Sequence, residues 1–288
     1  MRVQPDRYHE LNAGAVRACL PVRPRESHKG DYGKVLLLCG SRGFTGAARL
    51  AAKAALRTGS GLVYLGVPED VYPIVASGLE EPVVFPLPSD GNGRFSLAAL
   101  EEIRNRLDTV DAVLIGPGLG RSTELTLLLT EMIRYAKVPV VLDADGINGL
   151  SAHKDILRER SCPLILTPHD GEFRRLFPEI GVDRRTETVA AANSLSCVLL
   201  RKGHRTLITD GKTVYRNRTG NPGMAVGGSG DVLAGILVAL LGQGVEPLKA
   251  AALAAWIHGA AGDRAAARLG EYGMLPSDLT DEIPYILK

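Results

Sequence analysis

A glycine-rich segment that ends in an aspartate holds the residues best suited to chemistry in this sequence. Gly228, Ser229 and Gly230 stand directly before Asp231, where a long apolar segment with a helical pattern begins. Backbone N–H groups in the first turn of a helix attract anions, so these residues could form an anion hole for a phosphoryl group. The Asp231 carboxylate could accept the proton of an attacking hydroxyl. A capping role would explain Asp231 but not the glycines, and we therefore predict phosphoryl transfer to an alcohol.

Two further glycine-rich loops follow apolar segments of strand character. Gly40–Ala48 precedes an alanine-rich helical pattern and matches neither the Walker A loop nor GxGxxG. Gly116–Gly120 contains three glycines in five residues and precedes Ser122, a suitable helix N-cap. Glycine lets the backbone turn sharply and approach a ligand closely. Ligand contact and a structural turn are both open for the first loop, whereas we predict ligand contact for the second.

Polar side chains cluster after three other strand-like segments. Asp143–Asn148 carries two carboxylates and an amide, which either orient a substrate and hold Mg²⁺ through water or cap a turn. In Thr167–Phe173, His169 could hydrogen-bond a substrate and Glu172 could act on metal-bound water, or both could be structural or solvated loop residues; their clustering favours ligand contact. Lys202 precedes a glycine and either meets a phosphate as a flexible charge or belongs to a surface turn.

The segments between these loops predict the elements that position them. Short apolar segments alternate with helical patterns, as expected for parallel strands covered on both faces. The sequence predicts strands at Val35–Cys39, Gly61–Val67, Ala112–Ile115, Val138–Leu142, Leu164–Leu166, Cys197–Arg201 and Thr206–Thr209. Helical patterns cover Gly46–Thr58, Ser122–Tyr135, Arg185–Leu195, Asp231–Leu241 and Leu248–Arg268. Asp210-Gly-Lys predicts a hairpin with an antiparallel edge, and Glu80–Pro88 a loop with an edge strand. We predict one α/β domain over residues 1–288, a three-layer sandwich with helices on both faces of a mainly parallel sheet.

The composition excludes several classes of protein. The chain has 288 residues, of which 45% are hydrophobic, and a formal net charge of +2. This charge is too small for a nucleic-acid surface, and no segment is apolar enough to span a membrane. The four cysteines have no metal-ligand spacing, so we expect buried free thiols. The polar N-terminus lacks a signal sequence, and we predict a cytoplasmic protein without nucleic-acid or membrane partners.

Taken together, these loops resemble those of the ADP-dependent NAD(P)H-hydrate dehydratases, a branch of the ribokinase-like superfamily. The resemblance rests on segments that occur in the family's order: Gly40–Ala48, Gly116–Gly120, Asp143–Asn148, Thr167–Phe173 and Asn221–Asp231. It implies a ribokinase-like fold and an ADP-driven dehydration of the hydrated nicotinamide ring back to NADH or NADPH. The form Thr-Pro-His-x-Gly-Glu points to ADP rather than ATP, with AMP and phosphate as products.

The same resemblance implies roles for individual residues. Asp231 would take the proton of the ring hydroxyl, and the catalytic anion hole would consist of Gly228, Ser229 and Gly230. The hydrated dinucleotide would contact Ala47, Gly118 or Gly120, His169 and Asp231. The AMP part of ADP would contact Lys202, Gly203, His204, Arg205, Thr206 and Gly230. Mg²⁺ is the expected cofactor, with its ligands unassigned.

The resemblance also implies partners. Many members carry an epimerase domain, for which the residues before Lys34 are too few, so we expect a separate NAD(P)H-hydrate epimerase and action on the S epimer alone. Members often form tetramers, and the alanine-rich segment Ala250–Ala267 is small-sided enough for close packing between subunits.

Other functions remain open on the residues themselves. A ribokinase-like kinase of a vitamin-precursor alcohol would use Asp231 in the same way, because it too must activate a hydroxyl. A non-catalytic nucleotide sensor would be recognised by loss of Asp231 or its glycines, and both are present. A dinucleotide oxidoreductase would require a strand–GxGxxG–helix unit that the sequence lacks.

Overall fold

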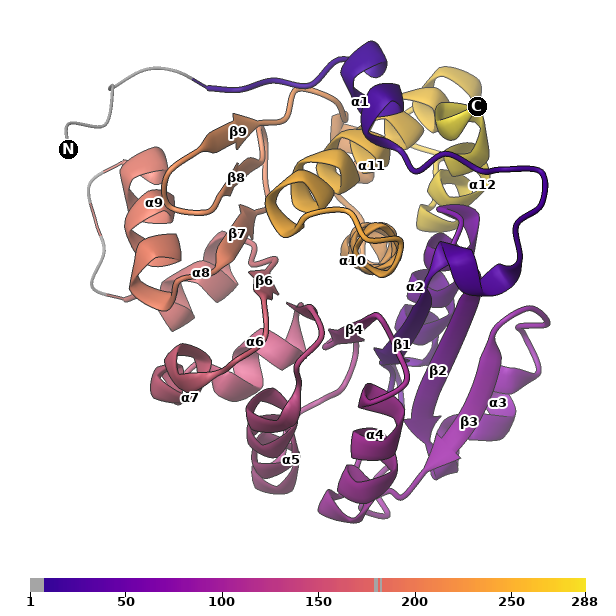
Figure 1. The fold of residues 1–288 in the computed structure, drawn as a ribbon, viewed down its shortest axis with the longest axis vertical. Helices are drawn as coiled ribbons and strands as arrows, with labels where there is room; N and C mark the ends of the chain where they lie inside the picture. Colours follow the sequence, from indigo (N-terminus) through magenta and orange to yellow (C-terminus); the bar gives the residue numbers. More distant parts are fainter. Residues whose placement is uncertain (1–7, 179–180, 182) are drawn as a thin grey trace.

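One nine-stranded sheet forms the middle of the computed structural model, which describes residues 8–178, 181 and 183–288 (Figure 1). The strand order is β3-β2-β1-β4-β5-β6-β7-β8-β9. The strands are β1 (Lys34–Leu38), β2 (Leu62–Pro68), β3 (Val83–Leu87), β4 (Ala112–Ile115), β5 (Val140–Leu142), β6 (Leu164–Leu166), β7 (Val198–Arg201), β8 (Leu207–Thr209) and β9 (Val214–Arg216). Neighbours from β3 to β7 pair in parallel, whereas β8 pairs antiparallel with β7 and with β9. The predicted parallel sheet, its antiparallel hairpin and its edge strand are confirmed.

Helices cover both faces of this sheet, as the alternation of side chains in the strands requires. Val35 and Leu37 of β1 belong to one hydrophobic core, and Leu36 and Leu38 to the other. The first core is closed by α1 (Ala13–Cys19), α2 (Thr45–Arg57), α3 (Tyr72–Ala76), α10 (Ser229–Gly242), α11 (Pro247–Leu269) and α12 (Pro276–Leu287). The second is closed by α4 (Leu100–Leu107), α5 (Thr123–Tyr135), α6 (Asp145–Leu150), α7 (Lys154–Glu159), α8 (Asp170–Leu176) and α9 (Arg184–Leu195). The three predicted layers are therefore present.

Small residues let α2 and α10 pack closely, and this contact fixes where α10 begins. A Cβ on Gly235 of α10 would lie 2.3 Å from the carbonyl oxygen of Ala51 in α2, so no larger residue fits there. Every residue of α10 from Val232 to Gly242 is buried, as an all-apolar helix requires. Beside the start of α10, Gly228 lies against Leu50 of α2. The glycine-rich segment is thus brought next to the first loop of the sheet.

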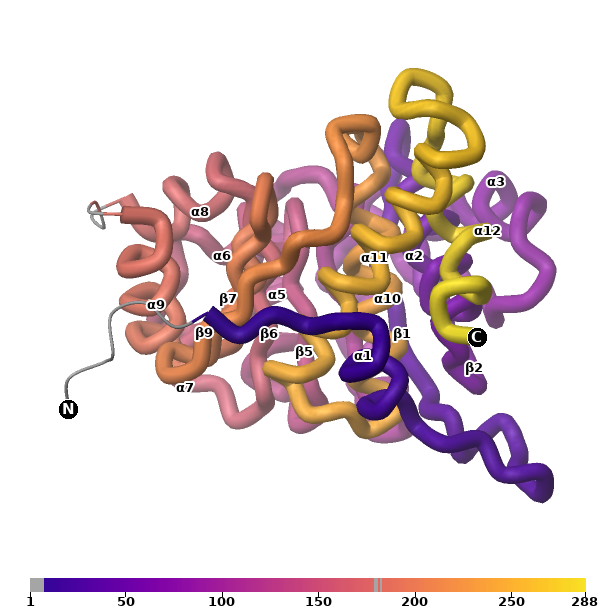
Figure 2. Tube along the Cα trace, turned by 90° about the horizontal axis from the view of Figure 1, so that it is seen from above, coloured from indigo at the N-terminus to yellow at the C-terminus, as the bar shows by residue number. Residues whose placement is uncertain are grey.

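The C-terminal part of the chain supports the same segment. In Figure 2 the stretch between β9 and α10 (orange) lies beside the turn between α11 and α12 (yellow). A Cβ on Gly223 would lie 2.6 Å from the carbonyl oxygen of Glu271 in that turn. Asp263 of α11 accepts hydrogen bonds from the Gly220 N–H (2.9 Å) and the Asn221 amide (3.1 Å). The loop that leads to Asp231 is therefore held by residues late in the sequence.

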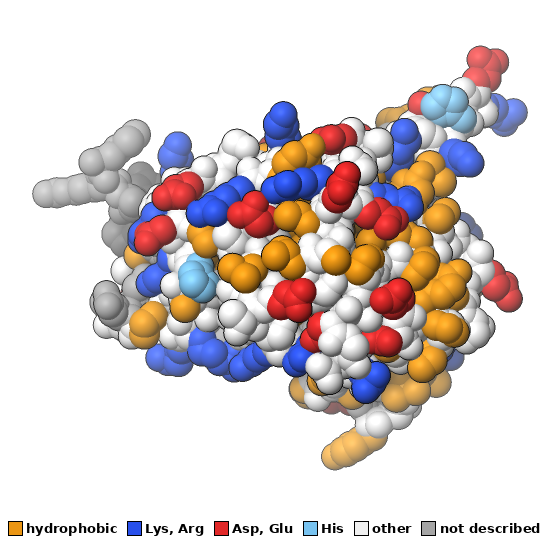
Figure 3. All heavy atoms as spheres, turned by 90° about the horizontal axis from the view of Figure 1, so that it is seen from below, with side chains coloured by type: hydrophobic (Ala, Val, Ile, Leu, Met, Phe, Trp, Pro, Cys, Tyr) orange, Lys and Arg blue, Asp and Glu red, His pale blue; other side chains and the backbone are white. Residues whose placement is uncertain are grey.

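The charged side chains on one face, the apolar helices and the cysteines can be described from the structure. On the face shown in Figure 3, acidic and basic side chains of the described residues are interspersed rather than gathered by sign. None of the helices in the described part of the chain is long and apolar enough to cross a membrane. All four cysteines are free thiols; three are buried and Cys19 is half-buried.

Candidate active site

The two glycine-rich loops meet where the strand order reverses. β1 lies between β2 and β4, so the connections after β1 and β4 diverge to opposite faces and leave room for a ligand at the carboxyl ends of the strands. The Gly40 N–H donates to the carbonyl of Pro117 (2.8 Å), and the Ser41 hydroxyl donates to that of Gly118 (2.7 Å). A Cβ on Gly118 would lie 3.1 Å from the Cβ of Ala47. The predicted substrate residues Ala47 and Gly118 are therefore adjacent.

Gly120 links the second loop to the acidic loop after β5. Its backbone has a φ of 74°, which favours glycine, and its N–H donates to the Asp145 carboxylate at 2.9 Å. Arg121 lies 3.7 Å from the same carboxylate. The carboxylate of Asp145 is thereby used to hold a neighbouring loop.

The start of α10 offers free backbone amides beside Asp231. Gly228 has a φ of 99° and turns the chain into the helix. Among the described residues, the N–H groups of Gly228 and Gly230 have no hydrogen-bond partner, whereas the Ser229 N–H donates to the Val226 carbonyl at 3.3 Å. The Ser229 amide thus closes the turn that begins the helix, and the amides left free at this end are those of Gly228 and Gly230.

A cluster of charges lies at the carboxyl ends of β5, β6 and β7. The Lys202 ammonium is 2.7 Å from the Asp143 carboxylate and 3.8 Å from that of Glu172. Asp143 also accepts a hydrogen bond from the Thr167 hydroxyl at 2.6 Å. The Lys202 side chain is only 18% exposed, while Asp143 and Glu172 are buried. Lys202 therefore lies inside the site and not in a flexible surface position.

The charge on Asp231 is set by this cluster. Burial and the negative charge of Asp143 together raise the pKa of Asp231 to about 7, although the positive charge of Lys202 acts to lower it. Burial alone would lower the pKa of Lys202, but Asp143 and Glu172 raise it above its ordinary value. Among the described residues, the Asp231 carboxylate has no hydrogen-bond partner. It is a carboxylate poised to exchange a proton near neutral pH.

His169 and Glu172 form the cap of α8. His169 Nδ1 accepts from the N–H groups of Gly171 (2.9 Å) and Glu172 (3.3 Å), and the Glu172 carboxylate accepts from the His169 N–H (2.9 Å). The structural role that the sequence left open is thus present, yet the His169 side chain is still 53% exposed. Its other ring nitrogen, Nε2, lies 3.3 Å from the Glu172 carboxylate, so both ring nitrogens already have partners within the cap.

The predicted nucleotide-binding turn leaves the site after Lys202. Gly203, His204 and Arg205 are exposed, and Thr206 is half-buried. The Arg184 guanidinium supports the turn from α9 by donating to the carbonyls of Lys202 (2.8 Å) and His204 (2.9 Å). The Lys202 side chain therefore enters the site, whereas the residues that follow it form a surface turn.

His258 is a site residue that the sequence analysis missed. Its Nε2 lies 3.2 Å from the Ser229 hydroxyl, reaching α10 from α11. Burial lowers the pKa of His258 to about 4, so the ring is neutral at physiological pH. No local signal marks it, because the surrounding sequence is an ordinary alanine-rich helix and the contact arises only when α11 packs on α10.

A strained residue lies between the two carboxylates of the acidic loop. Ala144 has a φ of 45° and a ψ of −114°, a backbone conformation that glycine adopts freely and alanine does not.

We predict that Ala144→Gly raises the free energy of unfolding by about 1 kcal/mol, because relief of strain outweighs the greater chain entropy of glycine. Chemical denaturation measures this change. Ala267→Gly, at an exposed helical position of α11, serves as the control and should lose about 1 kcal/mol. A loss at both positions would contradict the strained geometry of Ala144.

Comparisons with known proteins agree with this arrangement of loops. The family model described as NAD(P)H-hydrate dehydratase matches residues 35–285. The bifunctional NAD(P)H-hydrate repair enzyme Nnr of Moorella thermoacetica is 46% identical over 284 residues, which are 96% of this chain and 53% of that protein. The chain spans about half the length of the curated relatives it matches.

Solved structures share the fold over almost the whole chain. The ADP/ATP-dependent NAD(P)H-hydrate dehydratase from Bacillus subtilis, co-crystallised with ATP/Mg²⁺, is 31% identical with a TM-score of 0.80 and coverage of 96% of both chains. A ribokinase-like superfamily protein from Enterococcus faecalis V583 is 25% identical with a TM-score of 0.84 and coverage of 98% of both. The predicted ribokinase-like fold is confirmed.

Proposed function

The chain belongs to the NAD(P)H-hydrate dehydratase family, and from this premise we propose that it dehydrates the S epimer of hydrated NADH or NADPH at the expense of ADP. The observation that carries the proposal is the Asp231 carboxylate, which has no hydrogen-bond partner among the described residues and stands beside the free amides of Gly228 and Gly230. Its raised pKa suits a group that must take a proton from an alcohol near neutral pH.

In the first step the ring hydroxyl of the substrate becomes a phosphate ester. Asp231 takes the hydroxyl proton as the oxygen attacks the terminal phosphorus of ADP, and the bond from that phosphorus to the bridging oxygen breaks to release AMP. The Gly228 and Gly230 amides stabilise the charge on the transferring phosphoryl group. Lys202 supplies a positive charge at the same place, because a Cβ on Gly230 would lie 3.5 Å from its ammonium nitrogen.

In the second step the phosphate leaves the ring. The lone pair of the ring nitrogen expels it by breaking the carbon–oxygen bond, and loss of a proton from the neighbouring ring carbon restores the double bond of NADH or NADPH. Phosphorylation is useful because phosphate is a much better leaving group than hydroxide. The contacts proposed for the dinucleotide are Ala47, Gly118 or Gly120, His169 and Asp231.

The nucleotide is proposed to lie along the turn after β7. Its AMP part would contact Lys202 through Thr206 and the backbone of Gly230, next to the free amides that receive the phosphoryl group. The Bacillus relative is described as ADP/ATP-dependent. Our preference for ADP in this chain rests on the form of the Thr167–Glu172 segment.

The acidic residues of the site fit Mg²⁺ only together with a nucleotide. Within the described ranges, no group of three or more His, Cys, Asp or Glu side chains is arranged to hold a metal ion. Asp143 and Glu172 flank one cation position, where the Lys202 ammonium lies. Mg²⁺ prefers six oxygen ligands, which phosphates and water would have to complete. We propose that Asp143 or Glu172 holds nucleotide-bound Mg²⁺ through water, where it would neutralise phosphate charge.

The domain organisation, the supply of the substrate and the assembly of the chain are also proposals. The single-domain organisation is supported by one continuous sheet through the described chain. A NAD(P)H-hydrate epimerase, on this or another chain, would supply the S epimer, and several copies of the chain would assemble, a tetramer being the expected form.

The proposed reaction is tested by restoring reduced nicotinamide from its hydrate. Purified protein is incubated with NADH hydrate, Mg²⁺ and either ADP or ATP, while the absorbance of the dihydropyridine is followed and AMP is measured. We expect absorbance and AMP to rise together, and faster with ADP. A folded protein that produces neither with either nucleotide would refute the dehydratase function.

A further inference from the structure

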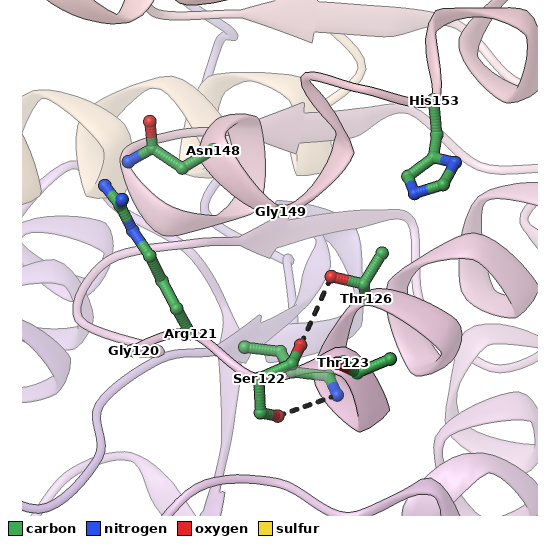
Figure 4. A pocket seen from close by; sticks show the side chains of 9 residues that line it. Gly120, Arg121, Ser122, Thr123, Thr126, Asn148, Gly149 and His153 are labelled. Carbon is green, nitrogen blue, oxygen red and sulfur yellow. Dashed lines mark hydrogen bonds between the residues drawn. The ribbon is translucent and has the colours of Figure 1, made fainter.

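A cavity opens beside Gly120, one of the proposed dinucleotide contacts. It has a volume of about 410 Å³, within the range of small-molecule pockets. Its walls come from the loop after β4, the first two turns of α5, and the end of α6 with the turn that follows (Figure 4). The lining residues are Gly120, Arg121, Ser122, Thr123, Leu125, Thr126, Asn148, Gly149 and His153.

The cavity shares one residue, Gly120, with the proposed substrate contacts. Gly120 lines it and also donates to Asp145, which lies two residues beyond Asp143 of the charged cluster. Gly118, two residues earlier in the same loop, is next to Ala47. A ligand whose reacting end lies near Asp231 could therefore extend past Gly118 and Gly120 into this cavity.

The charges around the cavity favour an anion. Its lining includes Arg121 and His153 and no carboxylate, and α5 directs the positive end of its dipole into it. Figure 4 shows Arg121 reaching from one wall towards Asn148, with His153 on another wall. The nearby Glu124 carboxylate is turned away and accepts from the Leu97 N–H at 2.7 Å.

Arg121 is the side chain most free to bind such a ligand. It is 66% exposed, and its one ion pair with the part of the chain that the structure describes, to Asp145, is long at 3.7 Å. Such an exposed pair contributes little, so a phosphate could redirect the guanidinium at small cost. By contrast, two other polar side chains of this wall are occupied: the Ser122 hydroxyl accepts a hydrogen bond from the Leu125 N–H, and the Thr126 hydroxyl donates to the Ser122 carbonyl.

We propose that this cavity binds the adenosine half of the hydrated dinucleotide and that Arg121 contacts the phosphate on its ribose, which makes the NADPH hydrate the preferred substrate. The inference rests on the proposed function. It adds to that function a second anchoring point, remote from the reacting ring, and a basis for choosing between the two hydrates. Because the contact is equal in the ground state and the transition state, it acts on KM rather than on kcat.

The test compares three hydrates at saturating ADP: those of NADPH, NADH and reduced nicotinamide mononucleotide, which lacks the adenosine half. We expect Arg121→Ala to raise KM for the NADPH hydrate about tenfold, because one charge-assisted hydrogen bond is lost. The KM values for the other two hydrates should stay unchanged. Arg121→Lys, which keeps the positive charge, should retain part of the preference. The control is Arg134→Ala, an exposed arginine in the last turn of α5, which should change no KM.

The outcomes separate this inference from the proposed function. Suppose that the wild type turns over the hydrates but that Arg121→Ala changes no KM, or changes KM equally for all three hydrates. Either result would overturn the role of Arg121 and leave the dehydratase function standing. Absence of turnover of all three hydrates by folded wild-type protein would instead refute the dehydratase function.

Discussion

Replacing Asp231 by Asn is expected to lower kcat for NADH hydrate with ADP by about 10²- to 10⁴-fold, the usual contribution of a general base. The amide keeps the size of the carboxylate but cannot take the proton of the ring hydroxyl. Single-turnover measurement of AMP formation checks the phosphoryl-transfer step directly. Asp281→Asn, at an exposed position of α12 that pairs with Lys53, is the matched control and should keep full activity. An Asp231→Asn variant with near-normal AMP formation would exclude Asp231 as the base.

The same substitution is expected to stabilise the protein at neutral and alkaline pH. The pKa of Asp231 is about 7 in the folded chain, above the ordinary value of an aspartate, so the folded state binds the proton more tightly than the unfolded state. The protonated Asp231 carboxyl therefore stabilises the folded state fully at a pH below the pKa that Asp231 has in the unfolded chain. This stabilisation is lost as the pH rises through 7. At pH 8 we expect Asp231→Asn to gain about 2 kcal/mol in the free energy of unfolding, and little at pH 4. A loss of activity in this variant would then not result from unfolding.

The pH dependence of the reaction is expected to follow the ionisation of Asp231. Because the base must be deprotonated, kcat/KM should fall below a pH near 7. Lys202 lowers the pKa of Asp231, so Lys202→Met should move this limb to higher pH by roughly one unit. Asp143 raises the pKa of Asp231, so Asp143→Asn should move the limb to lower pH. Profiles of kcat/KM against pH measure both shifts.

The opposite signs of these shifts make the prediction specific. General damage to the site would lower kcat/KM in both variants, but it would not move the pH at which kcat/KM falls in opposite directions in Lys202→Met and Asp143→Asn. Lys249→Met, an exposed lysine at the start of α11, serves as the control and should leave the profile unchanged. A limb that stays in place in both variants would contradict the charge coupling between the cluster and Asp231.

Most of the sheet and the large helices were predictable from local patterns. Strands buried on both faces need nearly continuous apolar residues, as in Val35–Leu38, and this pattern has few alternatives in a short segment. The helix α12 was not predicted, because Pro276 and Pro284 both appear as helix breakers in the sequence. In the structure Pro276 occupies the first turn, where its missing N–H costs nothing, and the helix is kept by packing on α11 and α2.

The candidate site was predictable in its loops but not in its contacts. Glycines and polar residues after apolar strands marked the segments around Gly118, Asp143, His169 and Asp231 as possible ligand contacts. Their chemistry was only partly visible: Lys202 could equally have been a surface charge, and His258 carried no signal. Only the folded chain brings Lys202 within 2.7 Å of Asp143 and His258 within 3.2 Å of the Ser229 hydroxyl.

The sequence by itself determined most strands and most long helices of this protein, the order of its loops and the identity of its proposed base, because strand burial, glycine conformation and helix termini are properties of short segments. The tertiary structure decided which loops meet, since the reversal of strand order between β1 and β4 joins segments far apart in the chain. It also decided the charge of Asp231, because burial and the distances to Asp143 and Lys202 exist only after folding. The cavity beside Gly120 likewise forms only when α5 and α6 pack together.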